Sequence, residues 1–548
     1  MRDAVSTQYA DLLTGGYDCV DRIVLNAYNV LCYNAGGFRC WWRRLTGSDD
    51  DLDNAHLMRM AGRFSRRVHG FAKAHQIPVV ECLRGERKHQ LAEEYLANHP
   101  EVHGLFLILV SHAAAPVWEV LRSSGGVPRN LQGKKAIVNH YSFPILDPDW
   151  GHLTIKMSGH PRFGAQIILN GHEYVRVQAG NAGVPCGVAG NAFTQVPEPD
   201  PLAAVADTFS EERMIGRLAA ACDRWISSCC LCFGLHSEDQ ERTGFRYQYS
   251  VYQLEYSRNL LFRDGHQLEQ VVQGLIDRTR SRLGVPELRT IFGQKHRPHQ
   301  DRKDRATQIA VRVETPVYDL TLFKLHFGKL TLKAYTKGEH VLRFEAIVHN
   351  AAALGIGRIL PRFPQLVAHL RGMVDRFLDT IWCLDHAFVA DATLEELPAP
   401  AHVGKTRVGG IDLNKPRMRA VLAAVLALAL APEGFRVGDL ARQVQQTRGF
   451  SADRYGTRQA AYDLKKLRAK GFLEPVAGSR RYQVNATGAR TLAALVVLRD
   501  RVIKPILAGT AAPKVGRKLK SYTAIDAHYE TLRKEMVALF ADLGLAAA

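Results

Sequence analysis

The C-terminal part of the chain contains FRVGDLARQVQQ at residues 435–446 and TRQAAYDLKKLRAKG at residues 457–471. Apolar residues recur in both segments at the three- and four-residue spacing of an amphipathic helix, so both are predicted to be helical. Beyond them lie FLEPV at 472–476 and RRYQVNATG at 480–488, separated by a short loop with a Gly-Ser pair, which predicts a hairpin. The predicted order is therefore helix, polar turn, basic helix and hairpin.

This order resembles a winged helix-turn-helix domain of the MarR-like kind, over roughly residues 434–500. The resemblance implies that the second helix enters the DNA major groove and that the hairpin, or wing, touches the DNA backbone. Between Thr457 and Tyr482 there are seven basic residues and two acidic ones, which favours nucleic acid over protein contacts, the alternative use of such a domain. The candidate nucleic-acid-binding residues in this region are Arg458, Gln459, Tyr462, Lys465, Lys466, Arg468, Arg480 and Arg481.

The whole chain is strongly basic. Its 548 residues include 72 lysines and arginines against 54 aspartates and glutamates, and 72 − 54 gives a net charge of +18. Such an excess predicts a polyanionic partner. DNA is the expected partner, RNA is the alternative, and no segment predicts membrane binding. The segment from Arg501 to Lys520 adds six basic residues and no acid, which would extend a track of phosphate contacts.

Composition and cysteine usage are typical of a globular protein in a reducing compartment. Hydrophobic residues make up 46% of the chain and charged residues 23%, which excludes a mainly disordered or fibrous protein. The ten cysteines follow no framework spacing, so we expect them to be reduced. No basic stretch followed by an apolar run opens the chain, and the longest apolar run, Ala420 to Ala431, is too short to span a bilayer. We therefore predict a cytoplasmic protein.

The length predicts several domains, and the order of elements predicts an α+β multidomain protein. Strands alternate with helices near the N-terminus, which is typical of a small α/β unit with a parallel sheet. Farther along, period-two segments predict a first hairpin that ends in an Asn-Gly turn at 170–171, and a second hairpin at 329–350. The predicted parts are a small α/β domain at 18–125, a β-rich segment with a His/Asp cluster at 136–200, a helical segment at 203–290, a β-hairpin plus helix at 306–396, and the winged helix with its basic tail at 411–548.

The segment from 139 to 174 concentrates carboxylates, imidazoles and a lysine on and around one predicted strand face. These groups are the ingredients for binding Mg²⁺ or Mn²⁺ and for stabilising the transition state of phosphodiester cleavage. The alternative is that they satisfy buried backbone groups around a simple Asp-Pro-Asp turn. The catalytic candidates are Asp147, Asp149, His152, Lys156 and His172, and the candidate metal ligands are Asp147, Asp149 and Glu173.

Three further features were weighed for function. On the second hairpin, alternation exposes Lys333 and Arg343 as candidate nucleic-acid contacts. The segment 84–88, RGERK, opens a predicted helix directly after a strand, a geometry that can hold a phosphate. It lacks the glycine spacing of nucleotide-binding loops, so no nucleotide cofactor is indicated. Tyr252 and Tyr256 have the i, i+4 spacing of core aromatics in a helix.

Together these features predict a nucleic-acid-binding protein that grips DNA through its C-terminal domain. A metal-dependent nuclease of a mobile element or defence system is the enzymatic form of this hypothesis. The alternatives are a non-enzymatic transcriptional regulator and an RNA-binding protein that holds a structured RNA. The sequence indicates neither an oligomeric state nor a target sequence.

Overall fold

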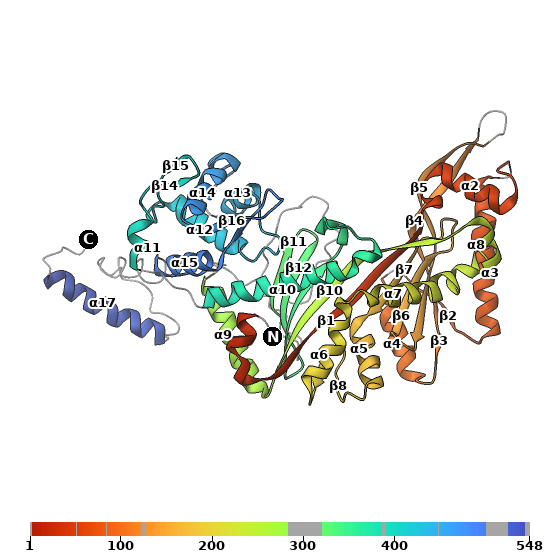
Figure 1. The fold of residues 1–548 in the computed structure, drawn as a ribbon, viewed down its shortest axis with the longest axis horizontal. Coiled ribbons are helices and arrows are strands. Elements are labelled where there is room, and N and C mark those ends of the chain that lie inside the picture. Colours follow the sequence, from red (N-terminus) through yellow and green to blue (C-terminus); the bar gives the residue numbers. More distant parts are fainter. Residues whose placement is uncertain are drawn as a thin grey trace. The chain divides into compact units, whose positions relative to one another are not determined.

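The computed structural model describes residues 3–50, 52–83, 85–122, 128–282, 321–385, 391–447, 449–499 and 524–542 (Figure 1). The predicted basic tail at 501–520 lies outside the described residues. The chain divides into two compact units. Unit 1 consists of Met1–Asp11, His266–Glu314 and Asp375–Ala548, and unit 2 consists of Leu12–Gly265 and Thr315–Val374.

Unit 2 is built around one sheet of eleven strands. Its order is β11-β12-β13-β10-β1-β7-β6-β5-β4-β2, with β3 beside β5. In the described chain, β2 and β4 form its one parallel pair, and the other neighbours are antiparallel. The strands are β1 (Leu13–Asn29), β2 (Val79–Glu81), β3 (Gly104–Leu105), β4 (Ile108–Arg122), β5 (Pro128–Asp147), β6 (Gly151–Ser158), β7 (Ala165–Asn170), β10 (Tyr247–Phe262), β11 (Thr321–Phe327), β12 (Leu330–Lys337) and β13 (Val341–Val348).

The long strands β1 and β10 join two halves of this sheet (Figure 1). On one side, β7 pairs only with Arg22–Ala27 of β1. On the other side, β13 pairs only with Leu254–Leu261 of β10. A β-bulge between Val20 and Ile23 interrupts the β1–β10 ladder near the point where the two halves meet. The first half of β1 therefore has no strand on its β7 side, and α6 (Pro199–Asp207) contacts it there, with Pro199 against Gly15.

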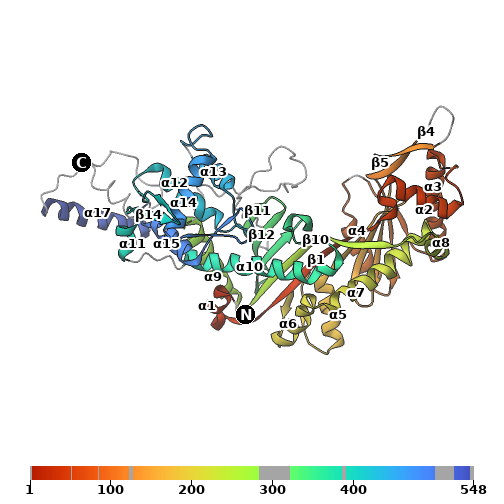
Figure 2. The ribbon, with the colours of Figure 1, turned by 45° about the horizontal axis from the view of Figure 1, so that its top comes forward.

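Helices pack on both faces of the sheet: α4 (Lys88–Asn98) brings Ala92 into one cluster with Leu109 of β4, and an aromatic core lies on the opposite face. Phe64 of α3 (Asn54–Ala74) packs on Tyr141 of β5, with 5.0 Å between ring centroids. In the other half, α10 (Phe363–Asp385) lies against β10, where Arg371 Nε donates a hydrogen bond of 2.7 Å to Tyr256 Oη (Figures 1 and 2). The remaining elements of unit 2 are α2 (Ala35–Thr46), α5 (Gly171–Asn181), α7 (Arg213–Cys222), α8 (Ser237–Thr243) and the β8–β9 hairpin (Gly187–Val188 and Phe193–Gln195).

Unit 1 contains a cluster of helices with two short hairpins. The contacts between α12, α13, α14 and α15 build this cluster, and the hairpins β14–β15 and β16–β17 join it. Its elements are α12 (Pro416–Leu428), α13 (Val437–Gln445), α14 (Thr457–Ala469), α15 (Ala486–Val497), β14 (Ala401–Val403), β15 (Thr406–Val408), β16 (Leu473–Pro475) and β17 (Tyr482–Val484). The other helices are α1 (Ala4–Gln8), α9 (Gly265–Arg282), α11 (Asp391–Glu396) and α17 (Ala524–Asp542).

Most of the longest apolar run, Ala420 to Ala431, lies in α12, in which nine residues are buried. No single helix of the described chain is both long and apolar enough to cross a membrane. One sharply bent pair of helices, Arg213–Phe233 with Ser237–Thr243, meets the requirements of length and composition. All ten cysteines are free thiols.

The α+β class predicted from the sequence is confirmed, but several elements differ from their predictions. Strands from the predicted parts 18–125, 136–200, 203–290 and 306–396 all enter one sheet, so these segments are not separate folding units. The expected parallel sheet at 18–125 is limited to β2 and β4, because β1 pairs antiparallel with β7 and β10.

The most consequential difference is β10, which lies within the predicted helical segment and carries Tyr252 and Tyr256. Residues Tyr256–Phe262 are buried on both sheet faces, which conceals the period-two pattern of a strand. The Asn170-Gly171 pair is not a hairpin turn either. The Asn170 side chain instead accepts a hydrogen bond from the His172 amide and caps α5.

The junction between β7 and α5 makes a sharp prediction about stability. A Cβ atom at Gly171 would lie 1.7 Å from the carbonyl oxygen of Val20, next to the β1 bulge. Gly171→Ala should therefore destabilise the protein by about 3 kcal/mol or more in urea unfolding. Gly180→Ala in the same helix is the matched control, because a Cβ there meets nothing within 4 Å. The control should be neutral or stabilising by about 0.5–1 kcal/mol. If both substitutions changed the free energy of unfolding equally, the close approach of Gly171 to the Val20 carbonyl would be contradicted.

Candidate nucleic-acid interface and buried polar centre

The C-terminal helices and hairpin occur in the predicted order, with α13 and α14 followed by β16 and β17. On α14, Ala460, Leu464 and Leu467 are buried and form the inner stripe of the helix. The preceding helix α13 contacts α14, and α12 contacts α13. One stripe of α14 thus faces the core of the cluster and leaves the opposite side exposed.

A buried ion pair fixes α14 to α12. The carboxylate of Asp463 on α14 is 1% exposed and accepts two hydrogen bonds of 2.9 Å from Arg417 Nε and Nη2. Tyr455 Oη donates a third hydrogen bond of 3.0 Å to the same carboxylate. Burial and the charge of Asp463 raise the pKa of Tyr455 well above its ordinary value. The acid in the middle of the basic helix is therefore neutralised inside the protein and does not offset the charge of the outer surface.

The exposed side of α14 carries cations. Arg458, Lys465 and Arg468 are exposed, and none of them forms an ion pair within the described residues. At spacings of seven and three residues they lie on one side of the helix. Arg480 is exposed at the tip of the hairpin. These four predicted contacts are available to a partner.

The other four predicted contacts of this region are engaged inside the protein. The residues form hydrogen bonds with backbone atoms. Gln459 Oε1 accepts from the Gly456 amide at 3.1 Å, Tyr462 Oη accepts from the Gly409 amide at 3.3 Å, Lys466 Nζ donates to the Gly410 carbonyl at 3.1 Å, and Arg481 Nη1 donates to the Gly434 carbonyl at 3.1 Å. These side chains therefore position α14 and the hairpin, although Tyr462 remains 45% exposed.

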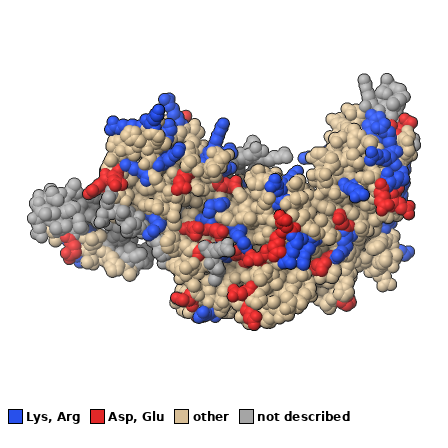
Figure 3. Space-filling model, viewed as in Figure 1, with Lys and Arg blue, Asp and Glu red and all other residues tan. Residues whose placement is uncertain are grey.

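Sequence reasoning missed the β14–β15 hairpin, because LPAPAHVG at 397–404 has the composition of a linker. Both strands contact α14, on the flank that carries Tyr462 and Lys466. Lys405 and Arg407 of this hairpin are exposed. Lysine and arginine side chains gather over the region that α14 and β15 occupy (Figure 3). The hairpin thus widens the basic surface beside α14.

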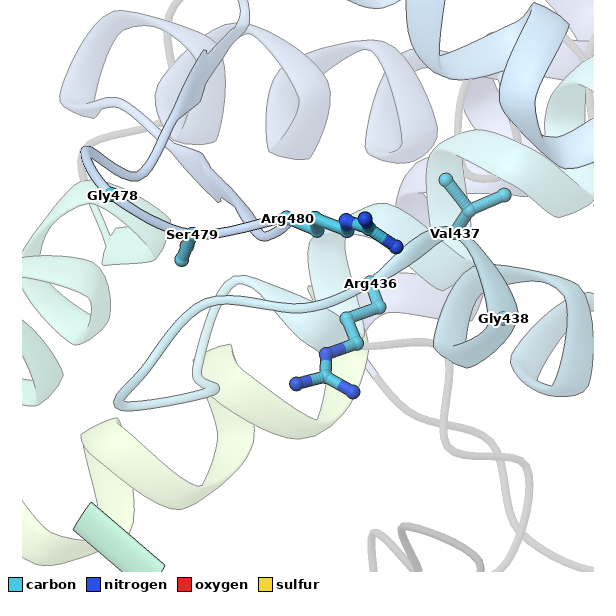
Figure 4. A pocket seen from close by; sticks show the side chains of 6 residues that line it. All are labelled: Arg436, Val437, Gly438, Gly478, Ser479 and Arg480. Atoms are coloured by element: carbon cyan, nitrogen blue, oxygen red, sulfur yellow. The ribbon is translucent and has the colours of Figure 1, made fainter. Parts of the chain in front are cut away.

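A cleft of about 880 Å³ lies between the start of α13 and the tip of the β16–β17 hairpin. Arg436, Val437 and Gly438 line it from α13, and Gly478, Ser479 and Arg480 line it from the hairpin. The Arg480 side chain extends from the hairpin toward the start of α13 (Figure 4). Arg436 and Arg480 are both exposed, so this cleft adds two cations to the same helical cluster.

In unit 2, the carboxylate of Asp147 is saturated by hydrogen bonds. Asp147 Oδ1 accepts from the amides of Asp149 and Trp150 at 2.8 and 2.9 Å. Asp147 Oδ2 accepts from Arg224 Nη1 at 2.9 Å and from Trp225 Nε1 at 2.7 Å. This is the structural alternative, in which the carboxylate organises the turn after β5. A metal at Asp147 would have to displace these four donors.

Within the described chain, the remaining candidates of this segment do not complete a metal site at Asp147, although Asp149 lies beside it and shares Arg224. Asp149 is 57% exposed and lies 3.7 Å from Arg224, while Glu173 pairs with Arg176 on α5 at 2.9 Å. His152 is half-buried, and burial lowers its pKa below the ordinary value. Among the described residues, Asp147, Asp149 and Glu173 do not form a group of metal ligands. Lys156 is exposed on the same sheet face as His152.

His172 belongs to a different, fully buried polar centre. Its Nδ1 atom lies 2.9 Å from Asp21 Oδ1, and its Nε2 atom lies 3.3 Å from Arg343 Nη2. Burial lowers the pKa of His172 below its ordinary value, which favours the neutral ring. Ser257 Oγ donates to Asp21 Oδ1 at 2.9 Å, and Arg343 Nε donates to Asn259 Oδ1 at 2.6 Å. Arg343 is therefore a buried counter-ion and not a surface phosphate contact.

The strand register explains how this centre forms. Cys19 pairs with Ser257, Ser257 pairs with Glu345, and Glu345 pairs with Lys333 across four neighbouring strands. Lys333 Nζ contacts Glu345 Oε2 at 2.8 Å, so the predicted contact Lys333 is also consumed by an internal partner. Asp21 is the hub of this centre. Its partners lie up to 322 positions away in the sequence, from 343 − 21, so no local pattern identifies these pairings.

Cys19, Asp21 and His172 are the one group in the described chain whose ligand atoms could together hold a metal ion, all lying within 4.8 Å of one another. Neither Asp21 Oδ2 nor His172 Nδ1 has a hydrogen bond of good geometry to a described atom. Thiol, imidazole and carboxylate are a donor set that suits Zn²⁺, whereas the expected Mg²⁺ or Mn²⁺ prefers oxygen ligands. Arg343 Nη1, 3.7 Å from Asp21 Oδ2, already supplies a positive charge to the carboxylate.

The comparisons with known proteins returned no family model, no curated protein and no solved structure that matches this chain. The site is therefore interpreted from its own geometry.

The stability of the protein is predicted to depend on pH through Glu255, a carboxylate of β10 near the polar centre. Burial and the nearby Glu345 carboxylate raise the pKa of Glu255 from 4.5 to about 7. Between pH 4.5 and 7 the folded protein keeps a proton on Glu255 that the unfolded chain has released. The stabilisation of the folded state by this proton is therefore fully present below pH 4.5 and is lost as the pH rises through 7. Glu255→Gln should therefore be more stable than the wild type at pH 8 by up to about 3 kcal/mol, and the difference should vanish near pH 4.5.

The measurement is urea unfolding of both proteins between pH 4.5 and 8. Glu173→Gln, which alters a partly exposed carboxylate in a surface pair, is the control and should follow the wild type. A wild-type minus Glu255→Gln difference that does not change with pH would contradict the assignment.

Proposed function

We propose that the C-terminal part of unit 1 is a winged helix-turn-helix domain that binds duplex DNA, with α14 as its recognition helix. The observation that carries the proposal is the set of exposed, unpaired cations Arg458, Lys465 and Arg468 on the outer side of α14. The internal neutralisation of Asp463 supports it, because the one acid of this helix does not oppose a phosphate.

Duplex DNA fits this surface better than duplex RNA. The major groove of B-DNA is about 12 Å wide and admits an α-helix, whereas that of A-form RNA is too deep and narrow for side chains to enter. On one flank of α14, the β14–β15 hairpin offers Lys405 and Arg407. The β16–β17 hairpin offers Arg480. In this arrangement, the two basic hairpins would contact phosphates at the edges of the major groove, and α14 would contact base edges inside it.

Phosphodiester cleavage is not part of this proposal. The carboxylate expected to bind the metal, Asp147, is saturated by four donors, and the imidazole of His172 faces Asp21 and Arg343 in a buried centre. Sequence-independent or sequence-specific binding of DNA by a regulator needs neither group.

The first test neutralises the outer side of α14. The triple variant Arg458→Gln/Lys465→Gln/Arg468→Gln should bind a 20-base-pair duplex at least about tenfold more weakly, because counterion release supplies much of the affinity. The slope of log affinity against log salt should fall by about 2 to 3, since each phosphate contact contributes about 0.9. Fluorescence anisotropy across a salt series measures both quantities.

The matched control removes three exposed lysines from unit 2, as Lys73→Gln/Lys134→Gln/Lys135→Gln. It lowers the net charge by the same amount and should leave the slope nearly unchanged. If both triple variants lose affinity equally, binding follows net charge and α14 is not the DNA-binding element.

The second test concerns the β14–β15 hairpin. Lys405→Gln/Arg407→Gln should lower the salt slope by about 1 to 2 without lowering the melting temperature, because both side chains are exposed. If the hairpin only supports α14 and does not contact DNA, the slope of log affinity against log salt should not change. Thermal unfolding and the same salt series separate the two outcomes.

A further inference from the structure

A second group of cations lies on the sheet face of unit 2 that carries His152 and Lys156. Lys88 opens α4, and its Nζ atom donates a hydrogen bond to Ser111 Oγ on β4. Ser111 pairs with His140 on β5 in the strand register. Since directly opposed residues of antiparallel strands share a sheet face, Lys88 and His140 lie side by side.

The next strand brings Lys156 to the same place. Ser142 lies two residues after His140 on β5 and pairs with Lys156 on β6, so all three side chains belong to one face. Burial lowers the pKa of Lys156 below its ordinary value, and the charges of Arg22 and Lys88 lower it further. Burial likewise lowers the pKa of His140, with Lys88 and Lys156 adding to the effect.

The two lysines of this face have no carboxylate partner among the described residues, whereas the charge of Arg22 acts on the Glu255 carboxylate of β10. His140 Nε2 is buried without a hydrogen-bond partner. Like charges that repel one another on a partly desolvated face raise the local positive potential. An anion would relieve this repulsion, and a protein keeps such a cluster at a cost in stability.

The face continues from the cations to exposed aromatic rings. Lys156 pairs with Gln166 on β7, and Gln166 pairs with Asn26 on β1, where the two amides form a hydrogen bond of 2.8 Å. Tyr28 is two residues farther along β1 on the same face, with its ring 6.1 Å from that of Tyr33. Tyr33 is 71% exposed, so its ring is accessible to a ligand.

We propose that this face of unit 2 binds a single-stranded nucleic acid, with the phosphates at Lys88 and Lys156 and a base against the Tyr28–Tyr33 pair. The site is separate from α14. A positively charged sheet face with an accessible aromatic ring is the combination that holds single strands without base pairing, since cations follow the backbone and rings stack on bases.

The extent of the surface favours a strand over a small phosphate compound. From β4 to β1 the face crosses four strand spacings, about 19 Å in all at 4.7–4.9 Å each. Lys156 and Tyr33 are exposed, so the surface is open and does not enclose a ligand. A site for one phosphate group would need its donors to converge on a single point, whereas these groups are spread over several strands.

The experiment uses the full chain in the Arg458→Gln/Lys465→Gln/Arg468→Gln background, so that binding at α14 is suppressed. Lys88→Gln/Lys156→Gln should weaken binding of a 20-nucleotide single-stranded DNA and RNA at least about tenfold and lower the salt slope by about 1 to 1.5, at roughly 0.7 per contact. Its melting temperature should not fall, because the substitution removes repulsion. Tyr33→Ala should weaken binding about fivefold or more with an unchanged salt slope, because stacking is not ionic.

Lys73→Gln/Lys329→Gln, which alters two other exposed lysines of unit 2, is the control and should bind the single strands like its parent. Inorganic phosphate and a mononucleotide at millimolar concentration should compete poorly. The proposal is overturned if the parent binds no single strand, if the control loses as much as Lys88→Gln/Lys156→Gln, or if inorganic phosphate alone displaces the oligonucleotide. Loss of duplex binding in the α14 variant concerns the winged helix and leaves this test unaffected.

Discussion

The buried carboxylate of Asp21 is the constraint on which the large sheet depends. Asp21 sits in the bulge of β1, close to the point where the strand changes from pairing with β10 alone to pairing with β7 as well. A buried charge is tolerated only when it is paired and hydrogen-bonded. Arg343 from β13, Ser257 from β10 and His172 from α5 provide those partners. Since each partner comes from a different element, the polar centre can form only when both halves of the sheet have been assembled in register.

The sequence predicted those elements whose pattern is local. The hairpins β6–β7 and β12–β13, the long helix α10 and the order of α13, α14 and the β16–β17 hairpin all carry a period or turn signal within a few residues. The strand β10 was predicted to be helical because its second half is buried on both faces and lacks alternation. The joining of four predicted parts into one sheet was equally hidden, because β1 pairs with a strand about 240 residues away and no short-range signal encodes that pairing.

The candidate site shows the same division. Residue type made His172 a catalytic candidate and Lys333 and Arg343 nucleic-acid candidates, whereas the structure pairs all three with internal partners on other elements. Arg343 and Lys333 have the alternation of surface cations, and only the register reveals that Asp21 and Glu345 neutralise them. Asp147 was the opposite case, in which a turn residue with ordinary hydrogen bonds resembled a metal ligand. Residue type thus narrows the list of candidate site residues, whereas the burial of each side chain and its partner on a neighbouring strand decide what it does.

The distribution of charge then follows from the cost of burial. Four buried carboxylates each face a cation: Asp21 faces Arg343, Asp147 faces Arg224, Glu345 faces Lys333, and Asp463 faces Arg417. Glu255 is the exception described above, because burial beside Glu345 raises its pKa. One-to-one pairing inside the protein leaves the net excess of +18 outside these pairs. That excess is not spread evenly, since α14 and the β14–β15 hairpin carry unpaired cations, and so does the sheet face around Lys88 and Lys156. Uncompensated charge raises the free energy of the unbound protein by self-repulsion, and a polyanion lowers it on binding. The same physics that forces pairing in the core thus leaves uncompensated positive charge on one surface of each unit within the described residues.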